Sequence, residues 1–88
     1  GEAGYLLETG ETAIDGVIPI NPSGGALGVG YLFECSGSYK VAEVCAQLRG
    51  EAGARQVQGA RIALAENGGG VLGNEEAAMC IHILEGPS

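Results

Sequence analysis

The chain has few aromatic residues and few bases. Among its 88 residues there are no tryptophans, one phenylalanine and three tyrosines, and four Lys and Arg stand against eleven Asp and Glu. A protein that binds nucleic acid or an anionic membrane surface needs a basic face to neutralise the phosphates. The net charge of −7 therefore argues against both kinds of partner.

Long apolar runs are also absent. No stretch of the sequence approaches the roughly 20 apolar residues that a membrane-spanning helix needs. The chain does not open with a basic and then apolar leader either. We predict no membrane span and a cytoplasmic protein.

The three cysteines, Cys35, Cys45 and Cys80, are widely spaced and form no Cys-x-x-Cys motif. An odd number at such spacing argues against a disulfide framework and against a zinc site. Each cysteine is more typical of a small buried apolar residue than of a nucleophile. We therefore expect no metal site.

Glycine, by contrast, is abundant, with 17 residues. Ordering a glycine costs more backbone entropy than ordering any other residue. A chain of this length buries only about 60% of the surface that it exposes when unfolded. We therefore expect the chain to be part of a larger protein, or to fold against other subunits.

The first third of the chain is predicted to be irregular. Residues 1–16 are acidic and glycine-rich, which indicates a surface lead-in. Residues 17–35 are predicted to form a Gly-rich active-site loop. It opens with the apolar residues 17–20, where a proline permits only a short edge strand or an extended loop, and it continues with a turn signal at residues 21–25. Four glycines in residues 24–30 argue against a helix there.

The clearest helix is predicted over residues 36–50. Apolar residues recur at helical spacing and form one stripe: Val41, Val44, Cys45 and Leu48. A serine at position 36 or 38 is expected to supply the N-cap. Arg49 suits the negative end of the helix dipole, and Gly50 is a natural stop.

Two strands are predicted over residues 60–86. The first covers residues 61–65 and ends at the Asn-Gly-Gly-Gly run, 67–70, which begins a loop. The second, residues 77–84, is apolar on both alternating faces, as is typical of a central strand covered on both sides. Between helix and strands, residues 51–59 are a polar loop with room for a helical turn. This order predicts an α/β fold with the helix packed on one face of a layered sheet.

Few residues suggest chemistry by type alone. His82 is the only histidine, and in the most apolar strand it is more often a satisfied core residue than a catalyst. Glu75 and Glu76 are neighbours in a loop, which usually indicates a solvated turn. Glu66 ends a strand just before the Asn-Gly-Gly-Gly run, so it is a candidate acid, although a solvated strand end is the commoner case. Residues 24–30 could cradle a phosphate, but no Gly-Lys-Ser/Thr follows them.

Two longer strings carry a family resemblance. The run Asn-Pro-Ser-Gly-Gly at residues 21–25 and the run Gln-Leu-Arg-Gly-Glu-Ala-Gly-Ala-Arg-Gln-Val at 47–57 resemble the C-terminal half of thiolases, in the sterol-carrier or lipid-transfer branch. The resemblance covers about residues 10–86. It implies the C-terminal part of a thiolase fold, layered α-β-α-β-α, with a mixed sheet and one main helix. It also implies three partners or ligands: the remainder of the thiolase fold, a second thiolase subunit, and coenzyme A as part of the substrate rather than as a bound cofactor.

The chain departs from the family pattern at two places. Thiolases carry a histidine after the glycine that matches Gly30, and here Tyr31 stands there, followed by Leu32. Many thiolases carry a catalytic Cys-x-Gly before the last strand, and here residues 66–70 contain no cysteine. A phenol with an ordinary pKa of about 10 can exchange a proton with an alkoxide, but it activates a thiol poorly at neutral pH. These departures argue against acyl transfer through an acyl-cysteine.

The pattern is similar to that of thiolase-like aldolases, which cleave a β-hydroxyacyl-CoA by a retro-aldol step with tyrosine as acid/base, and pair with an OB-fold partner subunit. The resemblance therefore implies Tyr31 as the catalytic residue. Backbone amides of Gly30 and of Gly68, Gly69 and Gly70 would position the thioester oxygen, and Glu66 and Asn21 are possible contributors. Two alternatives stay open: an acetyl-CoA acyltransferase with unusual residues, and a non-catalytic lipid-carrier or scaffold subunit.

Overall fold

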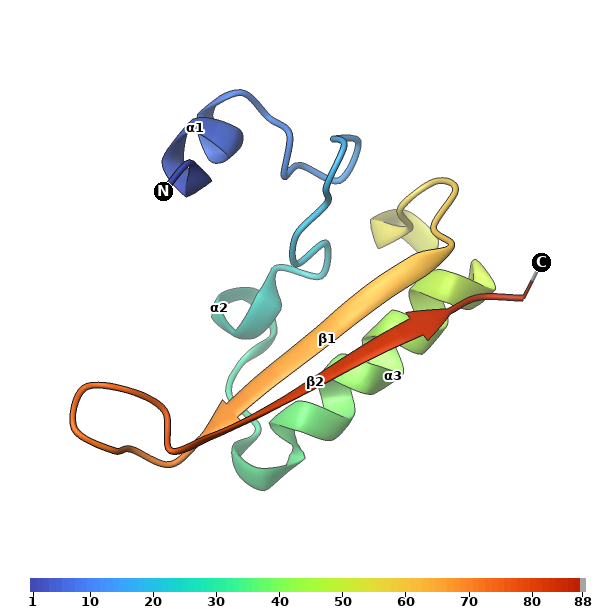
Figure 1. Ribbon diagram of the computed structural model, residues 1–88. Coiled ribbons are helices and arrows are strands. Elements are labelled where there is room, and N and C mark those ends of the chain that lie inside the picture. The colour runs from blue at the N-terminus through green and yellow to red at the C-terminus, as the bar shows by residue number, and fades with distance from the viewer. Residues whose placement is uncertain (88) are drawn as a thin grey trace.

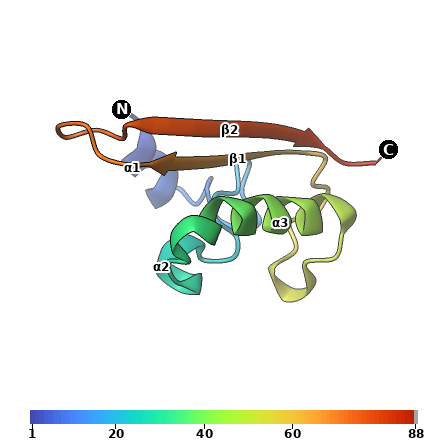
Figure 2. The same cartoon turned by 90° about the horizontal axis from the view of Figure 1, so that it is seen from below.

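The structure, a computed structural model, describes residues 1–87. Its elements follow in the order α1 (Ala3–Glu8), α2 (Gly25–Val29), η1 (Phe33–Cys35), α3 (Ser36–Arg49), η2 (Gly53–Arg55), β1 (Ile62–Gly69) and β2 (Ala78–Glu85). The two strands pair antiparallel, and α3 runs along one face of them (Figures 1 and 2). The predicted α/β class with one main helix is confirmed. The mixed pairing expected of a larger sheet stays a prediction, because only two strands are present here.

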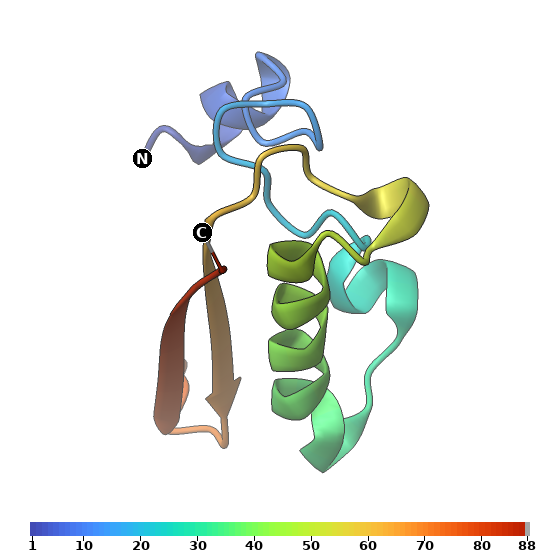
Figure 3. The same cartoon turned by 90° about the vertical axis from the view of Figure 1, so that its right-hand side faces the viewer.

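Figure 3 shows the layers from the side. The sheet lies on one side of α3, and α2 with the segment that leads to α3 lies on the other side. The short helix α1 belongs to the predicted lead-in, away from α3. The helix α3 is therefore the element that separates the sheet from the glycine-rich segment.

The bounds of α3 match the predicted helix, but its N-cap differs. Gly50 ends it in the left-handed conformation, with φ of 73° and its N–H donating to the carbonyls of Ala46 and Gln47, as expected of a C-terminal glycine. The predicted serine cap is wrong, because Cys35 precedes the helix and no side chain caps it. The Ser36 hydroxyl instead accepts the Leu32 N–H at 3.2 Å, so it fixes the preceding turn.

The first strand is longer than predicted. We expected residues 61–65, with a break at Asn67, but β1 runs from Ile62 through Gly69, with Gly68 opposite Met79 and Gly69 opposite Ala78. Glycine weakens a strand without forbidding it, and here the cross-strand partners extend the ladder to the turn. The loop begins only at Gly70, whose φ is 70°.

The prediction of no helix in residues 24–30 is also wrong. The helix α2 forms a single turn between Gly24, with φ of 93°, and Gly30, with φ of 108°. Gly28 N–H donates to the Gly24 carbonyl at 3.0 Å and Gly30 N–H to the Ala26 carbonyl at 2.9 Å. Each glycine destabilises a helix by about 1 kcal/mol relative to alanine. This cost adds up over a long helix, but a single turn flanked by Gly24 and Gly30 can still form.

Residues 17–20 form an extended loop, the second of the two predicted options. The amides of Ile18 and Ile20 donate to the carbonyls of Glu11 and Thr12. These bonds tie the loop to the lead-in rather than to the sheet. Residues 53–55 make the helical turn that the polar loop 51–59 had room for.

Few apolar side chains are buried within residues 1–87. The buried ones are Ala52 and Ala65, exposed by 2% and 6%. Because side chains alternate along a strand and Ala65 is covered, the face of the sheet toward α3 also carries its cross-strand partner His82. The opposite face carries Glu66 and Glu85 and five large apolar residues that are 53% to 71% exposed: Ile62, Leu64, Met79, Ile81 and Ile83. We call these five residues the open sheet face. The prediction of a strand covered on both sides is thus wrong for this chain taken alone, since only α3 covers the sheet.

None of the helices in residues 1–87 has the length and apolar character that crossing a membrane requires.

Candidate functional site

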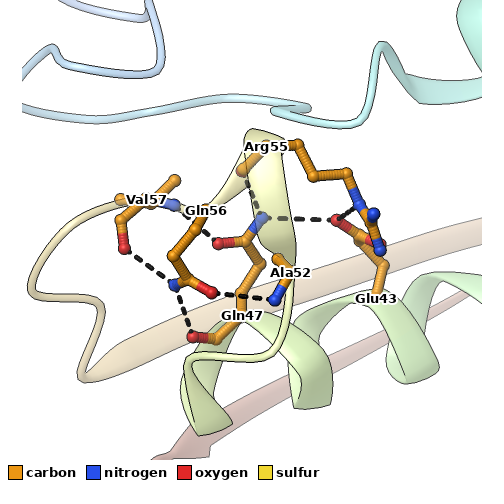
Figure 4. Close-up of polar contacts among 6 residues, drawn as sticks. All are labelled: Glu43, Gln47, Ala52, Arg55, Gln56 and Val57. Atoms are coloured by element: carbon orange, nitrogen blue, oxygen red, sulfur yellow. Dashed lines mark hydrogen bonds and ion pairs between the residues drawn. The ribbon is translucent and has the colours of Figure 1, made fainter.

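The string at residues 47–57 forms a polar network that fastens the loop after α3 to the helix (Figure 4). Gln47, only 6% exposed, donates to the Arg55 carbonyl and accepts the Val57 N–H, both at 2.8 Å. Gln56 accepts the Ala52 N–H at 3.0 Å and donates to the Gln47 carbonyl at 2.9 Å. Buried amides are stable only when their donors and acceptors are paired, and these two glutamines pair with each other's backbone segments.

An ion pair completes this network. The Arg55 Nε lies 2.8 and 3.0 Å from the two Glu43 carboxylate oxygens. The hydrogen bond from Arg55 lowers the pKa of Glu43 against the opposing effect of burial, and the Gln47 amide lowers it further. The string that resembles thiolases therefore has a structural role here: it closes the η2 loop onto α3.

Tyr31 lies in the segment between α2 and η1. Its ring is 68% exposed and lies against Phe33, with ring centroids 5.1 Å apart and planes inclined by 52°. Phe33 has a φ of 52°, an uncommon conformation for a residue with a bulky side chain. The Tyr31 hydroxyl has no hydrogen-bond partner in the described chain. The phenol is therefore open to solvent and to a ligand.

Gly30 contributes conformation rather than a free amide. Its φ of 108° and ψ of 164° lie in a region that only glycine adopts readily. Its N–H donates to the Ala26 carbonyl at 2.9 Å, and its expected role at a thioester oxygen stays a prediction. Gly30 instead lets the chain leave α2 in the direction that presents Tyr31.

Gly68, Gly69 and Gly70 differ from one another. Gly68 and Gly69 belong to β1, and the Glu76 carboxylate lies where a Cβ on Gly68 would be. Glu76 is exposed in the loop before β2, as predicted, and its carboxylate lies over the strand. Gly70 begins the hairpin loop, and its N–H donates to no acceptor within residues 1–87. Gly70 is thus the one of the three glycines whose amide lies outside the strand ladder and has no acceptor within residues 1–87.

Glu66 and Asn21 have different settings. The Glu66 carbonyl accepts a hydrogen bond from Lys40 Nζ at 3.0 Å, while strand alternation assigns its carboxylate to the open sheet face. Asn21, with φ of 49°, shapes the turn before α2: its carbonyl accepts the Gly24 N–H at 2.8 Å, and its side chain lies against Gly25. No contact of either side chain with Tyr31 is found within residues 1–87.

The structure gathers the two glycine-rich regions at one end of α3. The segment that carries Tyr31 and the tip of β1 lie at the same end of the molecule, on opposite sides of α3 (Figures 2 and 3). A Cβ on Gly37 would be 3.5 Å from the Asn67 side-chain amide, so β1 touches the first turn of α3. No hydrogen bond joins Tyr31 to residues 68–70 within residues 1–87.

Sequence comparison identifies the family. A family model described as thiolase C-terminal domain-like matches residues 1–84. The chain belongs to this thiolase family. The predicted family is therefore confirmed, and the one main helix and the two strands described above are part of its C-terminal domain.

Individual relatives agree with the predicted branch. Acetyl-CoA acetyltransferase of Methanothermobacter thermautotrophicus is 52% identical over 73 residues, 83% of this chain and 19% of that protein. Sterol carrier protein 2 of Rattus norvegicus is 46% identical over 67 residues, 76% of this chain and 12% of that protein. Non-specific lipid-transfer protein-like 2 of Caenorhabditis elegans is 32% identical over 77 residues, 83% of this chain and 19% of that protein. The chain thus spans a fifth or less of these relatives. No solved structure matches it.

This thiolase C-terminal domain carries functional groups that sequence reasoning missed. Lys40, Asn67 and His82 line one pocket between α3 and the sheet. His82 is exposed and not the satisfied core residue that we predicted. The signal that could have found the pocket is that Lys40 is the only base in the N-terminal half of the predicted helix.

The cysteines give no alternative centre. Cys35 and Cys80 are exposed and Cys45 is half-buried, so the prediction of small buried residues is wrong for the first two. Across residues 1–87, no group of three His, Cys, Asp or Glu side chains is arranged to hold a metal ion.

Proposed function

We propose that the protein containing this domain cleaves a carbon–carbon bond of a β-hydroxyacyl-CoA by a retro-aldol step, with Tyr31 as acid/base. The observation that carries the proposal is the Tyr31 phenol, which follows Gly30, is exposed, and has no hydrogen-bond partner of its own. A general acid or base must be able to reach the proton that it transfers. The exposure of Tyr31 supports this role.

The reaction needs a proton carrier and a stabiliser of negative charge. Removal of the proton from the β-hydroxyl breaks the bond between the α and β carbons, which yields a carbonyl product and the enolate of the shorter thioester. That enolate then takes a proton at carbon. We assign removal of the hydroxyl proton to the deprotonated Tyr31 oxygen, and Tyr31 then returns this proton to the enolate carbon. The free Gly70 amide is assigned to the thioester oxygen, because preorganised donors stabilise charge that develops in the transition state. The thioester would lie across the N-terminal end of α3.

The replacement of the family's Cys-x-Gly motif supports this reaction over transfer through a cysteine. Cys80 lies within β2, facing α3 beside Asn67, and no cysteine falls in residues 66–70. A retro-aldol step needs no covalent acyl-enzyme. The substrate would carry coenzyme A, and no bound cofactor is needed.

The open sheet face supports a larger assembly. Contiguous exposed apolar residues usually mark an interface, and here five of them lie on one side of the two strands, beside Glu66 and Glu85. We propose that the remainder of a thiolase fold covers this face. A second thiolase subunit and an OB-fold partner that binds the acyl-CoA stay proposals on the resemblance alone.

The test is Tyr31→Phe in the protein with its complete thiolase fold. We expect the rate of β-hydroxyacyl-CoA cleavage to fall by about 10²- to 10⁴-fold, the usual contribution of a general acid or base. The circular dichroism spectrum should not change. Tyr5→Phe is the matched control, because Tyr5 is similarly exposed at 64% and lies in α1. Cleavage at the wild-type rate by the Tyr31→Phe protein contradicts the proposal.

The name of the archaeal relative, acetyl-CoA acetyltransferase, favours a second candidate, acyl transfer to or from coenzyme A. It predicts thiolysis of a 3-ketoacyl-CoA by the same preparation, sensitive to alkylation of a cysteine. The relatives named as sterol carrier and lipid-transfer proteins favour a third, a non-catalytic lipid carrier. A folded protein with neither activity and with co-purified lipid would support that one.

A further inference from the structure

A pocket of about 440 Å³ lies between the N-terminal half of α3 and the sheet. Three elements contribute to it: α3, β1 and β2. Four of the residues that line it have polar side chains that can donate hydrogen bonds: Ser38, Lys40, Asn67 and His82. Tyr31 does not line this pocket, so it is distinct from the acid/base site proposed above.

Lys40 gives the pocket its charge. The Arg55–Glu43 pair is the one ion pair within residues 1–87, so the Lys40 ammonium has no carboxylate within 4 Å there. It donates to the Glu66 carbonyl at 3.0 Å, which uses one of its three N–H groups. The start of the 14-residue helix α3 adds partial positive charge to the same place. The pocket is thus locally positive in a chain of net charge −7.

The other polar groups of the pocket can all donate hydrogen bonds. Ser38 offers a hydroxyl, Asn67 an amide and His82 a ring N–H. Glu66 also lines the pocket, but strand alternation assigns its carboxylate to the opposite face from Ala65 and Asn67. An ammonium, a hydroxyl, an amide and an imidazole around one cavity, without a carboxylate, suit an oxyanion.

We propose that this pocket binds a phosphate group. Lysine recognises phosphate as a point charge, and charge-assisted hydrogen bonds to it are stronger than neutral ones. The phosphate could belong to the coenzyme A moiety of a thioester or be free inorganic phosphate. The assignment of the phosphate to coenzyme A rests on the proposed function. The proposal that the pocket binds phosphate does not depend on that function.

The first experiment titrates inorganic phosphate into the protein with its complete thiolase fold, by calorimetry at low ionic strength. We expect saturable binding, and Lys40→Met should weaken it at least about tenfold, since hydrogen bonds to charged groups contribute that much or more. His82→Gln should weaken it less. The control is Arg61→Gln, which removes a base that precedes β1 and lies outside the pocket. Wild-type phosphate affinity in a folded Lys40→Met protein, or an equal loss in Arg61→Gln, overturns the proposal.

A competition experiment then distinguishes the two sources. Coenzyme A that displaces phosphate from the wild-type protein assigns the pocket to the cofactor portion of the substrate. Coenzyme A that binds without displacing phosphate assigns it to the free ion. The two proposals also fail separately: normal phosphate binding by Lys40→Met overturns only the pocket, and full cleavage by Tyr31→Phe overturns only the retro-aldol role.

Discussion

Gly68 and Gly86, near the ends of the strands, lie where neighbouring atoms leave little space for a side chain. A Cβ on Gly68 would overlap the Glu76 carboxylate, the far end of a flexible side chain. A Cβ on Gly86 would lie 2.9 Å from the Leu48 carbonyl oxygen and 3.3 Å from its Cβ, where the Gly86 N–H also donates to the Arg61 carbonyl at 2.8 Å. The first neighbour can rotate away, and the second is held by the end of α3.

The two alanine substitutions should therefore differ in cost. Gly86→Ala forces a packed backbone apart, and overpacking of this kind costs about 1–3 kcal/mol. Gly68→Ala should cost less than about 1 kcal/mol, because Glu76 can move and alanine suits a strand at least as well as glycine. Thermal melts of the complete protein would measure the difference. A lower Tm for Gly68→Ala than for Gly86→Ala would contradict this reading of the contacts.

At the scale of elements, α3 and the η2 loop are joined by the Glu43–Arg55 pair and the two glutamines. The pKa of Glu43 is lowered in the folded protein, mainly by the hydrogen bond from Arg55. A lowered pKa stabilises the folded state above the unfolded value, 4.5, and this stabilisation is lost as the pH falls through the folded value, which is lower. The linkage between α3 and the loop should therefore weaken in acid and not at alkaline pH.

Glu43→Gln tests this linkage. At pH 7 the variant should melt below the wild type, since the ionised partner of Arg55 is gone. Below about pH 4.5 the difference between the two should shrink, because the wild-type carboxyl also becomes protonated. Glu51→Gln is the control, as Glu51 is exposed in the loop and pairs with no base. If the difference in Tm between wild type and Glu43→Gln stays constant from pH 7 to pH 4, the Glu43–Arg55 pair does not stabilise this loop.

The same elements show what local sequence can predict. The helix was predictable because its apolar stripe and Gly50 act within a few residues. The serine cap was not, since Ser36 accepts the Leu32 N–H and two serines competed for the position. The end of β1 was misplaced because a glycine penalty is local, whereas the pairing of Gly68 and Gly69 with β2 is not.

The candidate site also contains residues that local sequence could predict and residues that it could not. Tyr31 was predictable from its place after Gly30 in a family-like run. The pocket of Lys40, Asn67 and His82 was not, because Lys40 and its acceptor on Glu66 are 26 residues apart and their meeting depends on how α3 packs on the sheet. Pattern reasoning therefore found the residue that departs from its family, and it missed the residues that only packing brings together.

At the scale of the whole molecule, the open sheet face leaves large apolar side chains exposed to water. Ile81 is opposite Glu66 in the register and is flanked by Met79 and Ile83 on its own strand. An apolar strand face with no cover is unfavourable in water and prone to pairing with other chains. If a thiolase fold covers it, Ile81 is a core residue of the complete protein even though it is 53% exposed here.

Ile81→Ser tests whether the open sheet face is covered in the complete protein or remains exposed to solvent. In a covered face the substitution removes buried methyl groups and buries a hydroxyl, which should cost about 2–5 kcal/mol and lower the Tm by several degrees. On a solvent-facing surface the same change usually stays within about 0.5 kcal/mol. Val71→Ser, at the tip of the hairpin beyond the sheet and 82% exposed, should change the Tm little. Equal, small effects of the two substitutions on the Tm of the complete protein would mean that the open sheet face remains in contact with water, and that the remainder of the thiolase fold does not pack against β1 and β2.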